Sequence, residues 1–170
     1  MLIRVKEMKI NQKMVDALNG QINRELYSAY LYLGMSAYFE SENLHGFAKW
    51  VRVQAGEERV HAMKFFDYIV ERGGEVRLAP IDAPPTEWKS PLAAVENIYE
   101  HEQKVTAWIH ELLELAMDEK DYATANMLQW FVSEQVEEEA NAFDLVHKTK
   151  MLAGHGHALL CLDEELGKRE

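Results

Sequence analysis

Glu58 and His61, a glutamate and a histidine one helical turn apart, are the residues of this sequence best suited to metal chemistry. On a helix, side chains at positions i and i+3 lie on one face, about 5–6 Å apart at their Cβ atoms, so both can bind one metal ion. Their neighbours recur in alternating steps of four and three, the spacing of a face that packs against other helices: Phe47, Val51, Gln54, Glu58, His61, Phe65 and Tyr68. Because burying an uncompensated carboxylate is very costly, either this face is solvated or the core binds a cation.

The elements that would position this pair are helices, which we expect to form a single domain over residues 1–170. Hydrophobic residues make up 48% of the chain, enough for one sizeable core, and no Gly/Ser-rich linker divides it. All four prolines lie between Pro80 and Pro91, and the remainder is rich in good helix formers. Periodicity and capping signals predict helices at about 11–41, 44–72, 91–119, 122–153 and 158–166.

Residues 73–90 form a long stretch without helical periodicity, bounded by the stop signal Gly73-Gly74 and the start signal Ser90-Pro91. At about 3.3 Å per residue this loop can cover the roughly 40 Å length of the preceding helix, and so return the chain to the end where that helix began. The other connections are short. The sequence therefore predicts an all-α four-helix bundle, two antiparallel hairpins joined by one long crossover, followed by a short fifth C-terminal helix.

Each of the four long helices carries a polar interruption near its middle. The expected midpoints fall near residues 26, 58, 105 and 138, and the interruptions are Glu25, Glu58 with His61, Glu102, and Gln135 with Glu138. A midpoint stays a midpoint when a helix is reversed, so these side chains lie at one depth of the bundle. Converging carboxylates bind either protons or a cation. Several carboxylates with one imidazole favour iron or manganese, and carboxylate bridges favour a metal pair, so the pattern predicts a di-iron centre that oxidises Fe(II) with O₂.

Charge and composition exclude several other classes of function. The chain has 29 Asp and Glu against 18 Lys and Arg, a formal net charge of −11 that argues against a nucleic-acid partner and favours cations. No apolar run is long enough to span a bilayer or to form a signal-peptide core, so we expect a cytoplasmic protein with no membrane partner. Cys161 is the only cysteine, which excludes an internal disulfide and Cys-rich metal sites.

Four segments together resemble the prokaryotic non-haem ferritins: Glu25-Leu26-Tyr27-Ser28, Glu57-Glu58 with His61, His101-Glu102-Gln103, and the run from Leu128 to Glu139. The similarity covers nearly the whole chain. It implies one iron held by Glu25, Glu58 and His61, and a second held by Glu58, Glu102 and Glu138, with Glu58 as the bridge. It also implies Gln135 as a ligand or hydrogen-bond partner and Tyr32 as a redox-active neighbour. A third iron position would be formed by Glu57, Glu134, Glu137 and Glu138.

The resemblance also implies a ferroxidase that stores iron. Members of that family form a hollow shell of 24 subunits that admits Fe(II), oxidises it with O₂ or H₂O₂ and keeps the ferric product as a mineral, and the resemblance implies the same for this chain. Haem is not expected, because Arg59 stands where the haem ligand of bacterioferritins would be Met. The fourth long helix has Gln135-Val136-Glu137-Glu138 in place of a second Glu-x-x-His.

Two other functional classes stay open at this point. A di-iron oxidase or peroxidase of the rubrerythrin-like type, without storage, is disfavoured by the missing second histidine. A purely structural bundle with solvated polar residues is disfavoured by the matched depth of the glutamates. Glu42-x-x-His45 repeats the ligand spacing but lies where the helical pattern breaks, and His155 and His157 are expected to be spacer residues before the last helix. The segment Met1 to Lys9 has no assigned role.

Overall fold

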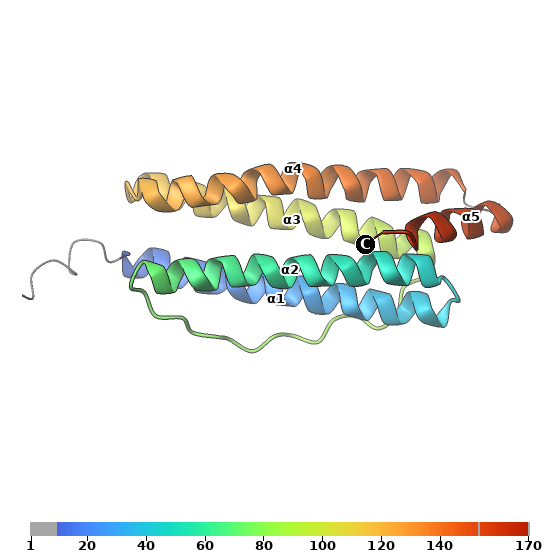
Figure 1. Ribbon diagram of the computed structural model, residues 1–170, viewed down its shortest axis with the longest axis horizontal. Helices are drawn as coiled ribbons and strands as arrows, with labels where there is room; N and C mark the ends of the chain where they lie inside the picture. Colours follow the sequence, from blue (N-terminus) through green and yellow to red (C-terminus); the bar gives the residue numbers. More distant parts are fainter. Residues whose placement is uncertain (1–9, 153, 170) are drawn as a thin grey trace, which may run out of the picture.

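The computed structural model describes residues 10–152 and 154–169, which form four long helices and a short one (Figure 1). They are α1 (Gln12–Ser41), α2 (His45–Glu71), α3 (Pro91–Asp118), α4 (Tyr122–Met151) and α5 (Gly156–Leu166). The segment Met1 to Lys9 and residue 153, the last of the expected fourth helix, lie outside the described residues. Within the ranges described, no helix combines the length and the apolar character that crossing a membrane requires.

Side-chain caps explain where three of the helices begin. The side chain of Asn11 accepts a hydrogen bond from the backbone N–H of Lys13 at 2.9 Å. Ser90 accepts one from Ala93 N at 3.1 Å, with Pro91 in the first turn, and Asp121 caps α4 in the same way. Such caps satisfy backbone donors that have no partner inside the helix. The short helix α5 has no side-chain cap and begins two residues before the start predicted from the sequence.

The crossover between α2 and α3 runs the length of the α1–α2 hairpin and makes α3 parallel to α2 (Figure 1). It is held along α1 by polar side chains. Asn19 donates to Glu75 O at 2.9 Å and accepts from the backbone N–H of Arg77 at 2.7 Å, and Asn23 donates to Pro80 O at 2.9 Å. Helices α1 with α2 and α3 with α4 form the closely packed pairs. The predicted all-α bundle with one crossover is confirmed.

The apolar core consists of two clusters, one at each end of the bundle. Along α1 the buried apolar residues of one cluster end at Ile22 and those of the other begin at Leu31; along α4 the corresponding break lies between Phe131 and Ala142. Helices α2 and α3 show the same break in the opposite order, as their direction requires. A polar layer therefore divides the core at the middle of all four helices, where the sequence interruptions occur.

Helix α5 folds back onto the beginning of α2. The backbone N–H of Phe47 donates to Asp163 Oδ1 at 2.9 Å, and Lys49 Nζ donates to the carbonyl oxygen of Gly167 at 2.9 Å. The contact is so close at Gly46 that a Cβ atom there would lie 1.6 Å from the carbonyl oxygen of Asp163. Only glycine fits at this crossing of α2 and α5.

Candidate metal centre

The polar layer contains six side chains that the sequence singled out, and each is at most 5% exposed: Glu25, Glu58, His61, Glu102, Gln135 and Glu138. They come from all four long helices, whose apolar periodicity turns these positions inward. Carboxylates are rarely buried so completely without a partner of opposite charge. No lysine or arginine is among the buried polar residues in the part of the chain described here, so the layer lacks a built-in cation.

Glu25, Glu58 and His61 form the first group, with one ligand atom from each lying within 4.8 Å of the others. His61 Nδ1 is 3.5 Å from Glu58 Oε2. Gln21 orients Glu25 by donating to its Oε1 at 2.7 Å. The Oε2 atoms of Glu25 and Glu58 are buried, and no donor from the described ranges reaches either of them. Two buried carboxylate oxygens without donors, facing an imidazole, are a geometry suited to a metal ion.

Glu102 and Glu138 complete the layer from α3 and α4. The hydroxyl of Tyr32 donates to Glu102 Oε1, and Gln135 Nε2 donates to Glu102 Oε2 at 3.1 Å. Gln54 Nε2 donates to Glu138 Oε2 at 2.8 Å. Each of these carboxylates thus has its orientation set by a neighbouring polar side chain, which is how outer residues position the ligands of a metal site. Gln135 acts here as a hydrogen-bond donor.

A second possible metal group lies on the outer side of His61. One ligand atom from each of His61, Glu134 and Glu138 lies within 4.8 Å of the others, and His61 Nε2 is 3.8 Å from Glu134 Oε1. The Glu134 side chain is 29% exposed, so this group leads from the core towards solvent. We call the four residues expected around a third iron, Glu57, Glu134, Glu137 and Glu138, the outer position. Of these, Glu134 and Glu138 come together in the group.

The other two members of the outer position do not join that group. Glu57 Oε2 instead accepts a hydrogen bond from Arg169 Nη2 at 2.7 Å. Glu137 is exposed and lines a cavity of about 550 Å³ together with Trp50 and Arg169. Arg169 was not predicted, because 112 residues separate it from Glu57 and helical periodicity reports only on neighbours within one helix.

Burial and mutual repulsion raise the pKa values of all four carboxyl groups in the layer. Burial is the main cause at each site, and the pKa of Glu25 is raised further by Glu58, while that of Glu58 is raised further by Glu102. The pKa of Glu102 is raised despite the hydrogen bonds it accepts, and the pKa of Glu138 reaches about 7. Without a cation, the layer therefore holds protons near neutral pH, and a metal ion would replace them.

Three buried polar residues near the layer were not predicted as part of the site. Gln21 lies four residues before Glu25, and Gln54 lies four residues before Glu58. Residues at this spacing face each other on a helix, so the two glutamines could have been predicted from the sequence as neighbours of the site. His101 Nε2 lies 2.7 Å from Ser28 Oγ, and its ring packs edge-on against Tyr32. Burial lowers the pKa of His101 to about 4, so this imidazole is neutral at physiological pH.

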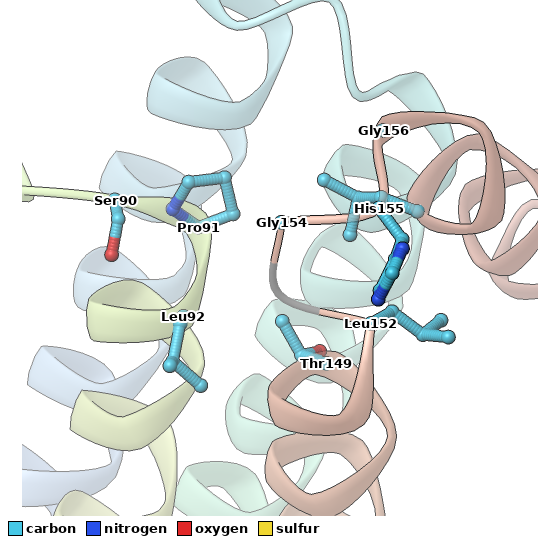
Figure 2. Close-up of a pocket in the computed structure, with 9 residues that line it drawn as sticks. Ser90, Pro91, Leu92, Thr149, Leu152, Gly154, His155 and Gly156 are labelled. Atoms are coloured by element: carbon cyan, nitrogen blue, oxygen red, sulfur yellow. The ribbon is translucent and has the colours of Figure 1, made fainter.

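The remaining histidines singled out by spacing lie away from the layer. His45 is exposed at the start of α2, with Nδ1 2.6 Å from Glu40 Oε2. His155 lines a cavity of about 420 Å³ between the start of α3 and the α4–α5 corner, and Figure 2 shows it close to Leu152. The cavity lies about three turns beyond Glu138 along α4. Among the described residues that line it, His155 is the only one with a metal-binding side chain.

The chain is similar to known proteins in its family, its sequence and its fold. The family model described as a ferritin-like domain matches residues 15–152. A bacterial non-heme ferritin of Bacteroides fragilis (strain 638R) is 44% identical over 160 residues, covering 94% of this chain and 99% of the relative. A bacterial non-heme ferritin of Campylobacter jejuni is 41% identical over 155 residues, covering 91% and 93% of the two chains.

Among solved structures, an open pore ferritin from the hyperthermophilic archaeon Archaeoglobus fulgidus superposes with a TM-score of 0.94 at 59% sequence identity. The match covers 95% of this chain and 100% of that one. The resemblance inferred from the sequence motifs is thus confirmed. Because the family model spans most of the chain and the relatives align over nearly their whole length, this protein is a member of the ferritin family.

Proposed function

We propose that this protein is a ferroxidase that stores iron, with Fe(II) as its substrate and the ferric product as its cargo. One Fe(II) would be held by Glu25, Glu58 and His61, and a second by Glu58, Glu102 and Glu138, with Glu58 between them. The observation that carries the proposal is the pair of buried Oε2 atoms on Glu25 and Glu58, which no donor in the described ranges satisfies. Membership of the ferritin family supports iron as the metal.

The reaction follows from placing two Fe(II) ions side by side. Each Fe(II) gives up one electron, so the pair supplies the two electrons that reduce O₂ to H₂O₂ with uptake of two protons, or that reduce H₂O₂ to water. The protein's own part is to hold the two ions and to exchange protons for them at carboxyl groups whose pKa values are raised. Tyr32, hydrogen-bonded to Glu102, would hold that carboxylate in position for the second Fe(II).

Storage requires a container, and we propose a homo-oligomeric cage of 24 copies in the cytoplasm. The archaeal structure, an open pore ferritin at 59% identity, supports a shell. The net charge of −11 favours a container that attracts cations. The outer position, where Glu134 and Glu138 meet His61, would hold a third iron on the route between the di-iron centre and the stored mineral.

The experiment is to add Fe(II) in air to metal-free protein, separate the products by size and assay iron in the protein peak. Iron far in excess of three atoms per chain, in a particle of cage size, is the expected result. Two or three iron atoms per chain on a small particle would contradict storage and favour a di-iron oxidase or peroxidase. Absence of any retained iron would contradict the metal centre itself.

A further inference from the structure

The chain after α5 returns to α2 and places the guanidinium of Arg169 against Glu57, a residue of the outer position. Arg169 Nη2 lies 2.7 Å from Glu57 Oε2, and the guanidinium carbon lies 4.7 Å from the centre of the Trp50 ring. Trp50 and Glu57 are seven residues apart, two turns along one face of α2, so the guanidinium stacks on the first while it bonds to the second. The side chains of Arg169 and Glu57 are 25% and 42% exposed.

The position of Arg169 does not depend on its ion pair alone. Asp163 accepts from the N–H of Phe47, Lys49 donates to Gly167 O, and Gly46 admits the backbone of α5 at a distance that no other residue allows. These contacts anchor the chain two residues before Arg169. The packing of α5 on α2 therefore helps to place Arg169 beside Glu57.

The contact itself is of a kind that a metal ion can displace. Arginine binds carboxylates most strongly through two parallel hydrogen bonds, but here only Nη2 bonds to Glu57. The other terminal nitrogen, Nη1, is buried and has no acceptor within the part of the chain that is described. Partly exposed ion pairs of this kind contribute little to stability. The guanidinium of Arg169 thus binds Glu57, one of the four residues of the outer position, through a single weak contact.

We propose that Arg169 is a cationic gate on the outer position: it holds Glu57 while that position is empty and gives it up when a divalent cation binds there. This inference rests on the outer position of the proposed function. If Arg169 acts in this way, the metal sites fill in a fixed order. The inner two metals, held by buried carboxylates that no arginine of the described ranges contacts, bind first, and the third must displace a positive charge from one of its own ligands.

The test is a titration of metal-free, full-length protein with Zn²⁺, which binds carboxylate and imidazole ligands without being oxidised. Calorimetry would compare the wild type with Arg169→Gln. We expect the third zinc to bind about threefold more tightly to the variant, the effect of removing one weak ion pair, with the first two unchanged. Lys168→Gln is the matched control, since it removes the same charge from the neighbouring residue, which has no ion pair with Glu57.

Two further variants exclude a merely structural effect. Arg169→Lys keeps the charge and should restore the affinity of the wild type for the third zinc. In a Glu57→Gln background, Arg169→Gln should have no effect on the third zinc, because the contact it would release is already gone.

Equal affinity for the third zinc in wild type and Arg169→Gln, or no third zinc in either, overturns the gate. Neither result contradicts the di-iron centre as long as two zinc ions bind per chain and Glu58→Gln abolishes them; the absence of a third zinc would contradict only the outer position. Failure of the wild type to bind those first two would instead contradict the di-iron centre. Thermal unfolding of each variant shows whether α5 and the bundle remain intact.

Discussion

The hydroxyl of Tyr32 donates a hydrogen bond to Glu102 across the junction of α1 and α3, and both side chains are almost completely buried. The two helices that this bond connects belong to different hairpins. The bond therefore ties the hairpins together at the depth of the metal centre. It also leaves Glu102 with donors on both oxygens, from Tyr32 and Gln135, and fixes the carboxylate before any metal arrives.

Tyr32→Phe tests this relationship, because it keeps the ring and removes only the hydroxyl. We expect the metal-free protein to lose about 1–2 kcal/mol of unfolding free energy, the usual value of a hydrogen bond to an ionisable partner. Two zinc ions should still bind per chain, while Fe(II) oxidation slows. Chemical denaturation, zinc titration and stopped-flow absorbance measure the three quantities. Stability equal to that of the wild type would show that the bond contributes nothing to joining the hairpins.

Glu58→Gln tests the bridge between the two metals. Glutamine has nearly the same shape but cannot supply a charged oxygen to two ions, so Fe(II) oxidation should fall at least about tenfold. The metal-free variant should unfold at a higher temperature than the wild type, because a buried carboxyl group that raises the pKa of Glu25 is gone. An unchanged oxidation rate would refute the assignment of Glu58, and a lower melting temperature would contradict the electrostatic account.

The stability of the metal-free protein should depend on pH through Glu138. Its pKa is raised to about 7 in the folded state, so the folded protein binds a proton that the unfolded chain has already lost. Stability is therefore fully present below about pH 4.5 and is lost as pH rises through 7, by on the order of 3 kcal/mol for this group alone. Glu25, Glu58 and Glu102, whose pKa values are also raised, act in the same direction.

His101 opposes this trend in part of the range. Its pKa is lowered to about 4, so the unfolded chain binds the extra proton and stability from this group rises with pH between about 4 and 6.5. A comparison of wild type with Glu138→Gln separates the two effects, since His101 is common to both. Unfolding free energies from pH 5 to 8 should fall less steeply in the variant. Parallel curves would show that Glu138 titrates normally.

Gly46→Ala tests the anchoring of α5. The added Cβ would overlap the carbonyl oxygen of Asp163, so α5 must move, and we expect a loss of about 1–3 kcal/mol from overpacking. Gly56→Ala is the control in the same helix, because its added Cβ would meet no atom of the described residues within 4 Å beyond the adjoining backbone of α2. It should stabilise the protein by about 0.5–1 kcal/mol. Equal effects of the two substitutions in thermal unfolding would contradict the close fit of α5 on α2.

Periodicity predicted the fold and the burial of the layer glutamates because it reports which face of a helix is buried. Glu25, Glu58, Glu102 and Glu138 interrupt apolar stripes, and the structure buries all four at the break between the two core clusters. Gln54 was visible in the same stripe, but its bond to Glu138 depends on how α2 faces α4. Such pairings join residues far apart in the chain, and local pattern does not determine them.

The outer position shows more clearly which contacts a local sequence pattern does not predict. The spacing of Glu134 and Glu138 places them on one face of α4, and the structure brings them together beside His61. Glu57 has the same residue type and adjoins Glu58, yet its partner is Arg169. The path of the chain after α5 decides that contact, and the packing of α5 on α2 at Gly46 has no sequence signature of its own.

Anomalous diffraction from a crystal of the protein loaded with Fe(II) without oxygen would show where each iron binds. We predict two strong iron peaks per chain in the polar layer, one bound by Glu25, Glu58 and His61 and the other by Glu58, Glu102 and Glu138. A weaker third peak near Glu134 would mark the outer position. Iron found only at surface carboxylates, with no metal bound to the Oε2 atoms of Glu25 and Glu58, would contradict the di-iron centre.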